Sequence, residues 1–147
     1  MEKVKLVNVG EINFQKAISL LKQNPKALEC GAILCFIGIV RERGYNGEKV
    51  KKLYYEVDEK NTLKFMEDLR KRVLERNKNV AEIVIHHVVG EAKPGEETVC
   101  IAAIGKHSKD VFDVVMETLK EVKTSIPIWK KEITEKHDYW VKGERGK

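Results

Sequence analysis

The sequence predicts an α+β fold with a mostly antiparallel sheet and flanking helices. Segments with strand-like alternation are mixed with separate helical segments, and two strands are joined by the tight turn Lys93-Pro94-Gly95-Glu96, as in a hairpin. With 147 residues and 42% hydrophobic side chains, the chain can bury one core of ordinary size. We therefore expect a single domain over residues 1–147, with a charged tail from about residue 142.

The first half of the chain opens with a strand and a short helix. Val4 to Val9 alternates weakly, as strands do, and Asn13 is placed to cap a helix that Asn24-Pro25 ends. Gly31 to Val40 is almost continuously apolar, which is typical of a strand buried on both faces. Arg41 then stands where this strand exits into a polar, glycine-containing loop.

An extended segment and a long helix follow. Lys52 to Val57 predicts a strand, and either Asp58 or Asn61 can cap the helix behind it. Apolar side chains recur at helical spacing until about Asn77, and Val80 to Val89 predicts the next strand.

The last elements are a strand, a helix and a strand. Thr98 to Ile104 completes the hairpin, and a final helix is expected from about Ser108 to Thr124, with Ser108 as its cap. Pro127 stops that helix, and Ile128 to Ile133 is compatible with a strand.

Composition excludes several classes of protein. The 28 basic and 23 acidic residues are interleaved, which suits an anionic small molecule or an acidic partner better than nucleic acid. The longest apolar run is far shorter than the roughly 20 residues of a membrane span, and no signal peptide is recognisable, so we expect a cytoplasmic protein. Cys30, Cys35 and Cys100 form neither an even set nor a Cys-x-x-Cys pair, which favours buried reduced thiols.

Two lysines near the C-terminus are candidate functional groups. Phe112, Met116 and Leu119 precede Lys123 at helical steps, so this lysine ends an apolar stripe. It either complements the helix dipole or is a partly shielded acid, base or nucleophile with a lowered pKa. Strand alternation places Ile128, Lys130 and Glu132 on one face and Trp129, Lys131 and Ile133 on the other.

Two further cations have both a structural and a functional interpretation. Arg41 is either a loop cation or a forked ligand for phosphate, and His107 either bridges a surface turn or lies at an anion-binding helix start. His86 and His87 point to opposite faces of one strand and cannot share a metal, and His137 stands apart. No zinc spacing or nucleotide-binding loop occurs, so we predict no metal and no cofactor.

Three separated segments carry a family resemblance. They are Gly31 to Arg41, His87 to Glu96, and Lys123 to Glu132, and the pattern Lys-x-x-x-Pro-x-Trp-Lys-x-Glu in the last is the most specific. In order and spacing they resemble the large, catalytic subunit of molybdopterin synthase, from the first strand to Trp140.

The resemblance implies an α/β hammerhead-type fold in a homodimer, within a heterotetramer that includes two small ubiquitin-like subunits. It also implies a sulfurtransferase activity. The small partner's C-terminal thiocarboxylate would enter a pocket and give its sulfur, in two rounds, to cyclic pyranopterin monophosphate, which forms the dithiolene of molybdopterin.

The resemblance also implies roles for particular residues. Lys123 and Lys130 occupy the catalytic positions, with Lys123 as the acid, base or covalent participant and Lys130 assisting it or orienting the thiocarboxylate. The substrate-binding positions are Ile39, Val40, Arg41, His107, Ser108, Lys131 and Glu132. Many family members have His-Arg where this chain has His107-Ser108, and Lys106 or Lys109 is placed to supply the missing cation.

Two other functions compete with this one. A non-catalytic adaptor could bind an acidic ubiquitin-like tail on the same basic surface, although the presence of both Lys123 and Lys130 argues against it. An RNA-binding α+β domain would use the net charge and several tyrosines, but no ribonucleoprotein motif supports it.

Overall fold

The computed structural model of the chain describes residues 2–44 and 46–141, so the charged tail expected from about residue 142 lies outside the described residues. Seven strands, three α-helices and one short 3-10 helix follow one another in the order β1 (Val4–Asn8), α1 (Phe14–Lys22), η1 (Ala27–Glu29), β2 (Ala32–Ile39), β3 (Val50–Val57), α2 (Glu59–Arg76), β4 (Val80–Ala92), β5 (Glu97–Gly105), α3 (Ser108–Thr124), β6 (Ile128–Thr134) and β7 (Asp138–Val141).

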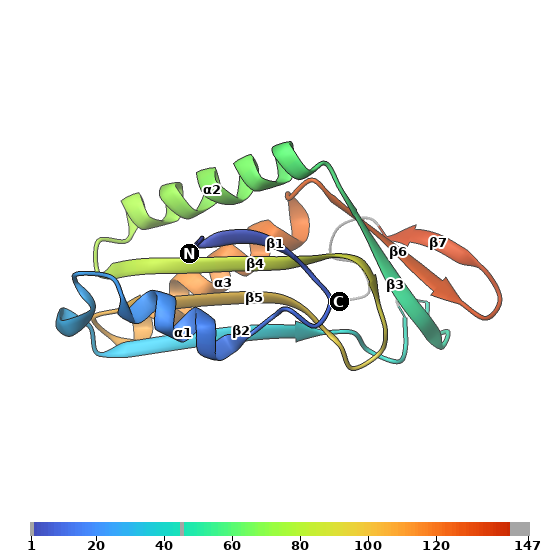
Figure 1. Cartoon of the computed structure of the whole chain (residues 1–147), viewed down its shortest axis with the longest axis horizontal. Coiled ribbons are helices and arrows are strands. Elements are labelled where there is room, and N and C mark those ends of the chain that lie inside the picture. Colours follow the sequence, from blue (N-terminus) through green and yellow to red (C-terminus); the bar gives the residue numbers. More distant parts are fainter. Residues whose placement is uncertain (1, 45, 142–147) are drawn as a thin grey trace.

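The sheet is mostly antiparallel, as the sequence predicted. Its strand order is β2-β5-β4-β3-β6-β7, and β1 lies beside β4 in the only parallel pairing among the described strands. The long strand β4 joins the two parts of the sheet, because it pairs with β1 and β5 along its length and with β3 only at Gly90 to Ala92. Figure 1 shows β3, β6 and β7 slanting away from the end of the other strands.

Helices cover both faces of the part formed by β1, β2, β4 and β5 (Figure 1). Helix α1 packs on one face, where Leu21, Val84 and Cys100 belong to one core cluster. Helices α2 and α3 pack on the other face, where Met66, Ile85 and a second set of apolar side chains are buried. Alternate strand residues therefore feed two separate cores.

Local capping signals predicted the helix starts well. Asn13 accepts a hydrogen bond from the backbone N–H of Lys16 at 3.0 Å, and Asp58 accepts one from Asn61. Helix α3 has the predicted limits, but Ser108 is its first helical residue and the N-cap position is held by His107. The prediction of Ser108 as the cap was therefore wrong by one residue, because the backbone is still extended at His107 and becomes helical at Ser108.

Two expectations about burial hold only in part. The apolar strand β2 packs against both cores, with Ile33, Cys35 and Ile37 on one face and Ala32, Leu34 and Phe36 on the other. Its side chains are at most partly buried, and it lies at the edge of the sheet, where it pairs only with β5 among the described strands. Of the three cysteines, which are all free, only Cys100 is fully buried, and its sulfur lies 3.7 Å from that of Cys35. Among the described helices, none has the length and apolar character needed to cross a membrane.

Candidate functional site

A cavity of about 430 Å³ opens where the two parts of the sheet meet the end of α3. This volume is in the range of small-molecule sites. Its wall combines apolar side chains with several charged and polar ones. Among its lining residues, six elements contribute Gly38 to Arg41, Tyr55, His87, Thr98, Lys123, Lys130 and Glu132.

The exit of β2 forms one wall, and the β4–β5 turn fixes its position. The backbone of Val40 bonds to that turn in both directions, by accepting from Gly95 at 2.8 Å and donating to Glu96 at 3.0 Å. Gly95 has φ +89°, a conformation that suits glycine. Arg41 follows directly and lines the cavity, together with Ile39 and Val40. Through these bonds, the resembling segment His87 to Glu96, which contains the turn, fixes the end of the resembling segment Gly31 to Arg41.

Lys123 and Lys130 are brought to the cavity by a reversal of the chain after α3. Lys123 lies in the last turn of α3, Lys130 lies on β6, and both line the cavity. Between them, the carbonyl of Pro127 accepts a hydrogen bond at 2.8 Å from the hydroxyl of Thr62, which is fully buried in α2. This contact anchors the start of β6, and so the spacing of the two lysines depends on a neighbouring helix.

The helical spacing of the apolar stripe that leads to Lys123 had suggested that it faces the core, but only Leu119 packs there. Phe112 is 60% exposed and Met116 is 69% exposed. The buried face of α3 carries Val111, Val114, Val115, Thr118 and Val122 instead. Lys123 itself is exposed at the cavity, so the expected shielding from water is not seen.

The pleat of β6 divides its charged residues between two faces. Ile128, Lys130 and Glu132 line the cavity, as the alternation predicted. Lys131 is not brought there, because it points to the opposite face, where its ammonium lies 5.6 Å from the Trp140 ring centre and 3.9 Å from Asp138.

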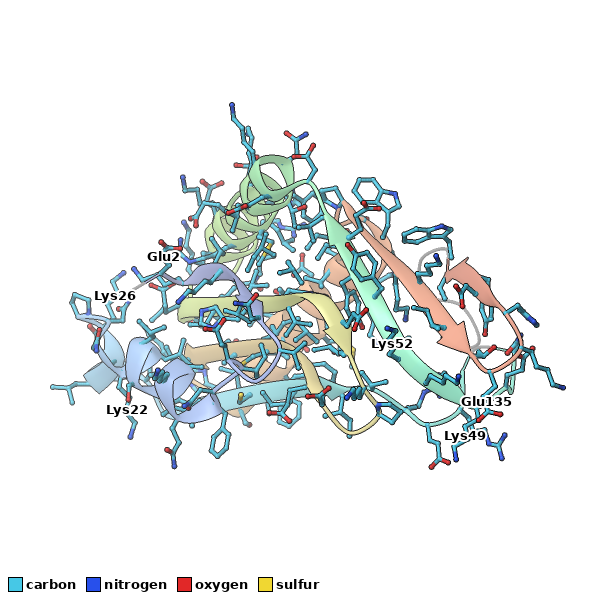
Figure 2. The ribbon with its side chains drawn as sticks, turned by 45° about the vertical axis from the view of Figure 1, so that its right-hand side comes forward. Glu2, Lys22, Lys26, Lys49, Lys52 and Glu135 are labelled. Atoms are coloured by element: carbon cyan, nitrogen blue, oxygen red, sulfur yellow. The ribbon has the colours of Figure 1, made fainter. Side chains whose placement is uncertain are left out.

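Lys52 of β3, labelled in Figure 2, belongs to the same outer face as Lys131. It pairs with Glu91 at 2.8 Å. Lysine side chains on this face are thus engaged by carboxylates and an aromatic ring.

His107 and Ser108 are also remote from this cavity. They stand at the start of α3, and His107 is sixteen residues before Lys123, which is about 24 Å at 1.5 Å per residue. The His107 side chain is 70% exposed, and its Nδ1 lies 2.9 Å from an Asp110 carboxylate oxygen. Within one chain, these two residues cannot contact a ligand held by Lys123.

Glu132 is a buried carboxylate in the cavity wall, with 5% exposure. The Tyr139 hydroxyl donates to it at 2.5 Å, and burial, followed by this bond, raises the pKa of Tyr139 to about 12. A Cβ on Gly44 would lie 2.3 Å from the same carboxylate oxygen, so a larger residue there would displace the Glu132 side chain. Tyr139 was missed by the sequence interpretation, since its role depends on the β6–β7 pairing.

His87 is a second polar residue that the sequence interpretation missed as part of a pocket. It lines the cavity, is 7% exposed, and its ring lies edge-on to that of Tyr55 with 5.0 Å between centres. Burial lowers the pKa of His87 to about 4, and the positive charge of Lys130 acts in the same direction. The sequence signal that could have indicated this pocket position is a histidine pair within the apolar run of β4.

Taken together, the lining groups suit an anionic substrate with polar edges. Arg41, Lys123 and Lys130 supply positive charge, which offsets repulsion when two anionic reactants meet. Lysine and arginine only donate hydrogen bonds, whereas a neutral His87 and the Glu132 carboxylate can accept them.

Comparisons with known proteins agree on one family. The chain matches the MoaE protein family over residues 7–125. A molybdopterin synthase catalytic subunit of Pyrococcus abyssi is 34% identical over 144 residues, which cover 97% of this chain and 93% of that protein. Molybdopterin synthase catalytic subunit 1 of Aedes aegypti is 36% identical over 126 residues, 86% of this chain and 75% of that protein.

Solved structures show the same fold. A molybdopterin synthase structure from Staphylococcus aureus has a TM-score of 0.85 at 25% identity, covering 96% of this chain and 98% of that one. A structure from Helicobacter pylori, described as a protein–protein complex of subunits 1 and 2 of molybdopterin-converting factor, has a TM-score of 0.74 at 18% identity and covers 96% of this chain and 91% of that one. At that identity, the second likeness concerns the fold alone.

Proposed function

This chain belongs to the MoaE family, whose curated members are molybdopterin synthase catalytic subunits, and we propose that its cavity is the place where sulfur reaches the pterin precursor. The family activity makes the chain an enzyme that transfers sulfur in molybdopterin biosynthesis. The observation that carries the proposal is the convergence of Arg41, Lys123 and Lys130 on one cavity of suitable volume. We place the enzyme in the cytoplasm.

The sulfur donor is the thiocarboxylated C-terminus of a small ubiquitin-like subunit, and the acceptor is cyclic pyranopterin monophosphate. The complex of two subunits in the Helicobacter pylori structure supports a partner of this kind. A phosphate and a thiocarboxylate are both anions, and the cavity presents cations to both. Two rounds of transfer yield the dithiolene of molybdopterin.

The two lysines and the arginine have different tasks in this proposal. Lys123, at the exposed end of α3, is the acid, base or covalent participant, and Lys130 orients the incoming thiocarboxylate or assists Lys123. Arg41 holds the phosphate, with Ile39 and Val40 shaping the wall beside it. Glu132 contacts the substrate from β6 or fixes the position of its neighbours through Tyr139.

Product formation by matched variants tests these roles. The purified chain is mixed with thiocarboxylated small subunit and cyclic pyranopterin monophosphate, and the dithiolene is quantified. Lys123→Ala and Lys130→Ala are each expected to lower the rate by about 100-fold or more, the usual loss when a charge-stabilising group is removed.

Each lysine has a neighbour that serves as its control. Lys120→Ala alters an exposed lysine of the same helix that does not line the cavity, and Lys131→Ala alters the outer face of β6. Both controls should keep activity near that of wild type. Equal losses in Lys130→Ala and Lys131→Ala would show that charge near the cavity, rather than a side chain inside it, is what matters.

His107 and Ser108 can take part only if a second copy brings them to the cavity. We place them, with Lys106 or Lys109 as the neighbouring cation, in the pocket of a homodimer partner within a heterotetramer. The exposed side chains of Phe112 and Met116 lie on α3 between Lys123 and His107, and antiparallel packing of two such helices would cover them.

Mixed dimers test this arrangement. If one copy carries Lys123→Ala and the other His107→Ala, one cavity of the pair keeps both residues and retains activity, whereas each homodimeric variant is impaired. If His107→Ala leaves the activity unchanged, His107 does not take part in the site.

The alternative function is a non-catalytic adaptor that binds a ubiquitin-like tail. It predicts complex formation with the small subunit but no dithiolene from the wild-type chain. The pairing of two lysines with an arginine around a cavity favours the enzyme, because tail binding alone needs no enclosed space.

A further inference from the structure

The ring of His87 is held in one orientation by two contacts and by its burial. Its Nδ1 lies 2.7 Å from the carbonyl oxygen of Val88, so Nδ1 carries the hydrogen and donates it. The Tyr55 ring packs against it edge-on, and the residue is 93% removed from solvent by the surrounding wall. A neutral ring with Nδ1 protonated has a lone pair on Nε2, which can only accept.

That lone pair has no hydrogen-bond partner among the described residues. The one fully enclosed side-chain oxygen or nitrogen without a partner in the described part of the chain is Thr118 Oγ1. Nε2 therefore keeps accessible surface, and the opening next to His87 is the cavity that this residue lines. A buried acceptor left unpaired is costly, so it is normally matched by a ligand or by water.

The surroundings determine which kind of group can match it. The low pKa keeps His87 neutral across physiological pH, so its ring does not compete with Lys123 and Lys130 for anions. Thr98, another polar lining residue, already donates its hydroxyl to the Gly38 carbonyl at 3.3 Å. The part of the wall around His87 thus complements a donor, while the cationic part complements an anion.

We propose that His87 is a substrate-binding residue, whose Nε2 accepts a hydrogen bond from an N–H or O–H group on the heterocycle of the substrate. The inference rests on the proposed function, because a pterin edge rich in N–H groups is the donor. It assigns the two ends of the substrate to different walls: the phosphate to Arg41, and the ring to His87.

Two variants separate the two ring nitrogens. His87→Asn places an amide near the position of Nδ1 and can keep the bond to Val88, but has nothing at Nε2. His87→Gln reaches the position of Nε2 and restores an acceptor there. For cyclic pyranopterin monophosphate, we expect His87→Asn to raise Kd by about tenfold, the equivalent of one hydrogen bond, and His87→Gln to stay within about threefold of wild type.

The opposite pattern overturns the proposal. If His87→Asn binds as well as wild type, or if a folded His87→Gln binds no better than His87→Asn, then Nε2 does not contact the substrate. Thermal unfolding of each variant shows whether it folds, since a purely structural ring would lower stability without this ordering of Kd values.

Nitrogen NMR of the wild-type chain gives a second test that needs no variant. The Nε2 signal of His87 is recognised because the ring does not titrate between pH 5 and 8, and because His86 bonds through Nε2 to the Glu2 carbonyl and so has the other tautomer. Saturating cyclic pyranopterin monophosphate should move the His87 signal toward that of a hydrogen-bonded nitrogen. An unmoved signal overturns the proposal.

The two tests also keep this inference apart from the proposed function. If wild type forms dithiolene but the His87 signal does not move, the enzyme stands and the His87 contact falls. If the signal moves but no dithiolene forms with thiocarboxylated partner, the contact stands and the sulfur-transfer function falls.

Discussion

The hydrogen bond from Thr62 to Pro127 offers the sharpest link between fold and site. Thr62→Val replaces the hydroxyl by a methyl group of similar size, so packing in α2 is kept and the 2.8 Å bond to the Pro127 carbonyl is lost. Leaving a partly buried acceptor without its donor costs about 1–3 kcal/mol. The same loss loosens the chain at Pro127, just before β6 and three residues before Lys130.

Thr118 on α3 is a matched counterpart with the opposite expectation. It is fully buried like Thr62, but its hydroxyl has no partner in the described structure. Thr118→Val removes an unsatisfied polar group, so the free energy of unfolding should rise by about 1 kcal/mol. Thr62→Ser, which keeps the hydroxyl, should fall between wild type and Thr62→Val.

Urea unfolding of the three variants and dithiolene formation under the same conditions provide the assay. Thr62→Val should also lower the rate by about tenfold, because small displacements of a catalytic group are expensive. Thr118→Val should leave the rate unchanged. Stability changes of the same sign and size in Thr62→Val and Thr118→Val would refute the assignment of one hydroxyl as bonded and the other as unsatisfied.

Three further predictions concern other parts of the molecule. Glu82→Gln removes a buried carboxylate that Arg70 contacts at 2.6 Å, so the free energy of unfolding measured in urea should fall by about 3 kcal/mol. Lys64→Ala, which breaks the exposed pair with Asp68, should leave the urea midpoint unchanged. Gly38→Ala adds a Cβ only 2.8 Å from a methyl group of Val99 in the cavity wall. Calorimetry should therefore find that the folded variant binds substrate more weakly. An unchanged Kd would contradict the placement of Gly38 in the wall of the substrate site. Because burial lowers the pKa of His87 to about 4, the unfolded chain, with a pKa near 6.5, takes up the proton first as pH falls. Stability should therefore drop by about 3 kcal/mol between pH 6.5 and 4, and His87→Gln, unfolded in parallel, should lack this part of the pH dependence.

Elements with strong local signals were predictable from the sequence. The limits of α3 follow from its apolar periodicity and from Pro127. The cap Asn13 follows from short-range side-chain chemistry, which also limited the cap of α2 to Asp58, the observed one, or Asn61. The division of Lys130 and Lys131 between two faces follows from the two-residue repeat of a strand. These features depend on neighbours within a few residues, which sequence patterns record directly.

Features that depend on distant partners could not be predicted in this way. Apolar residues in β2 look the same whether a strand lies at the centre or the edge of a sheet, and only the pairing order shows that β2 is at the edge. The stripe of Phe112 and Met116 has perfect helical spacing but lies on the exposed side of α3. The position of His87 in the cavity required knowing where β4 turns to meet β3.

The positive φ of Gly90 shows how one strand can serve both a core and a site. Up to Val88, β4 alternates between the two cores, and at Gly90, with φ +85°, it turns to pair with β3. His87 lies just before this change of direction, and Lys130 lies on β6, which pairs with β3; both residues line the cavity. The cavity therefore draws its wall from β4 before the turn and from the strands that β4 joins after it.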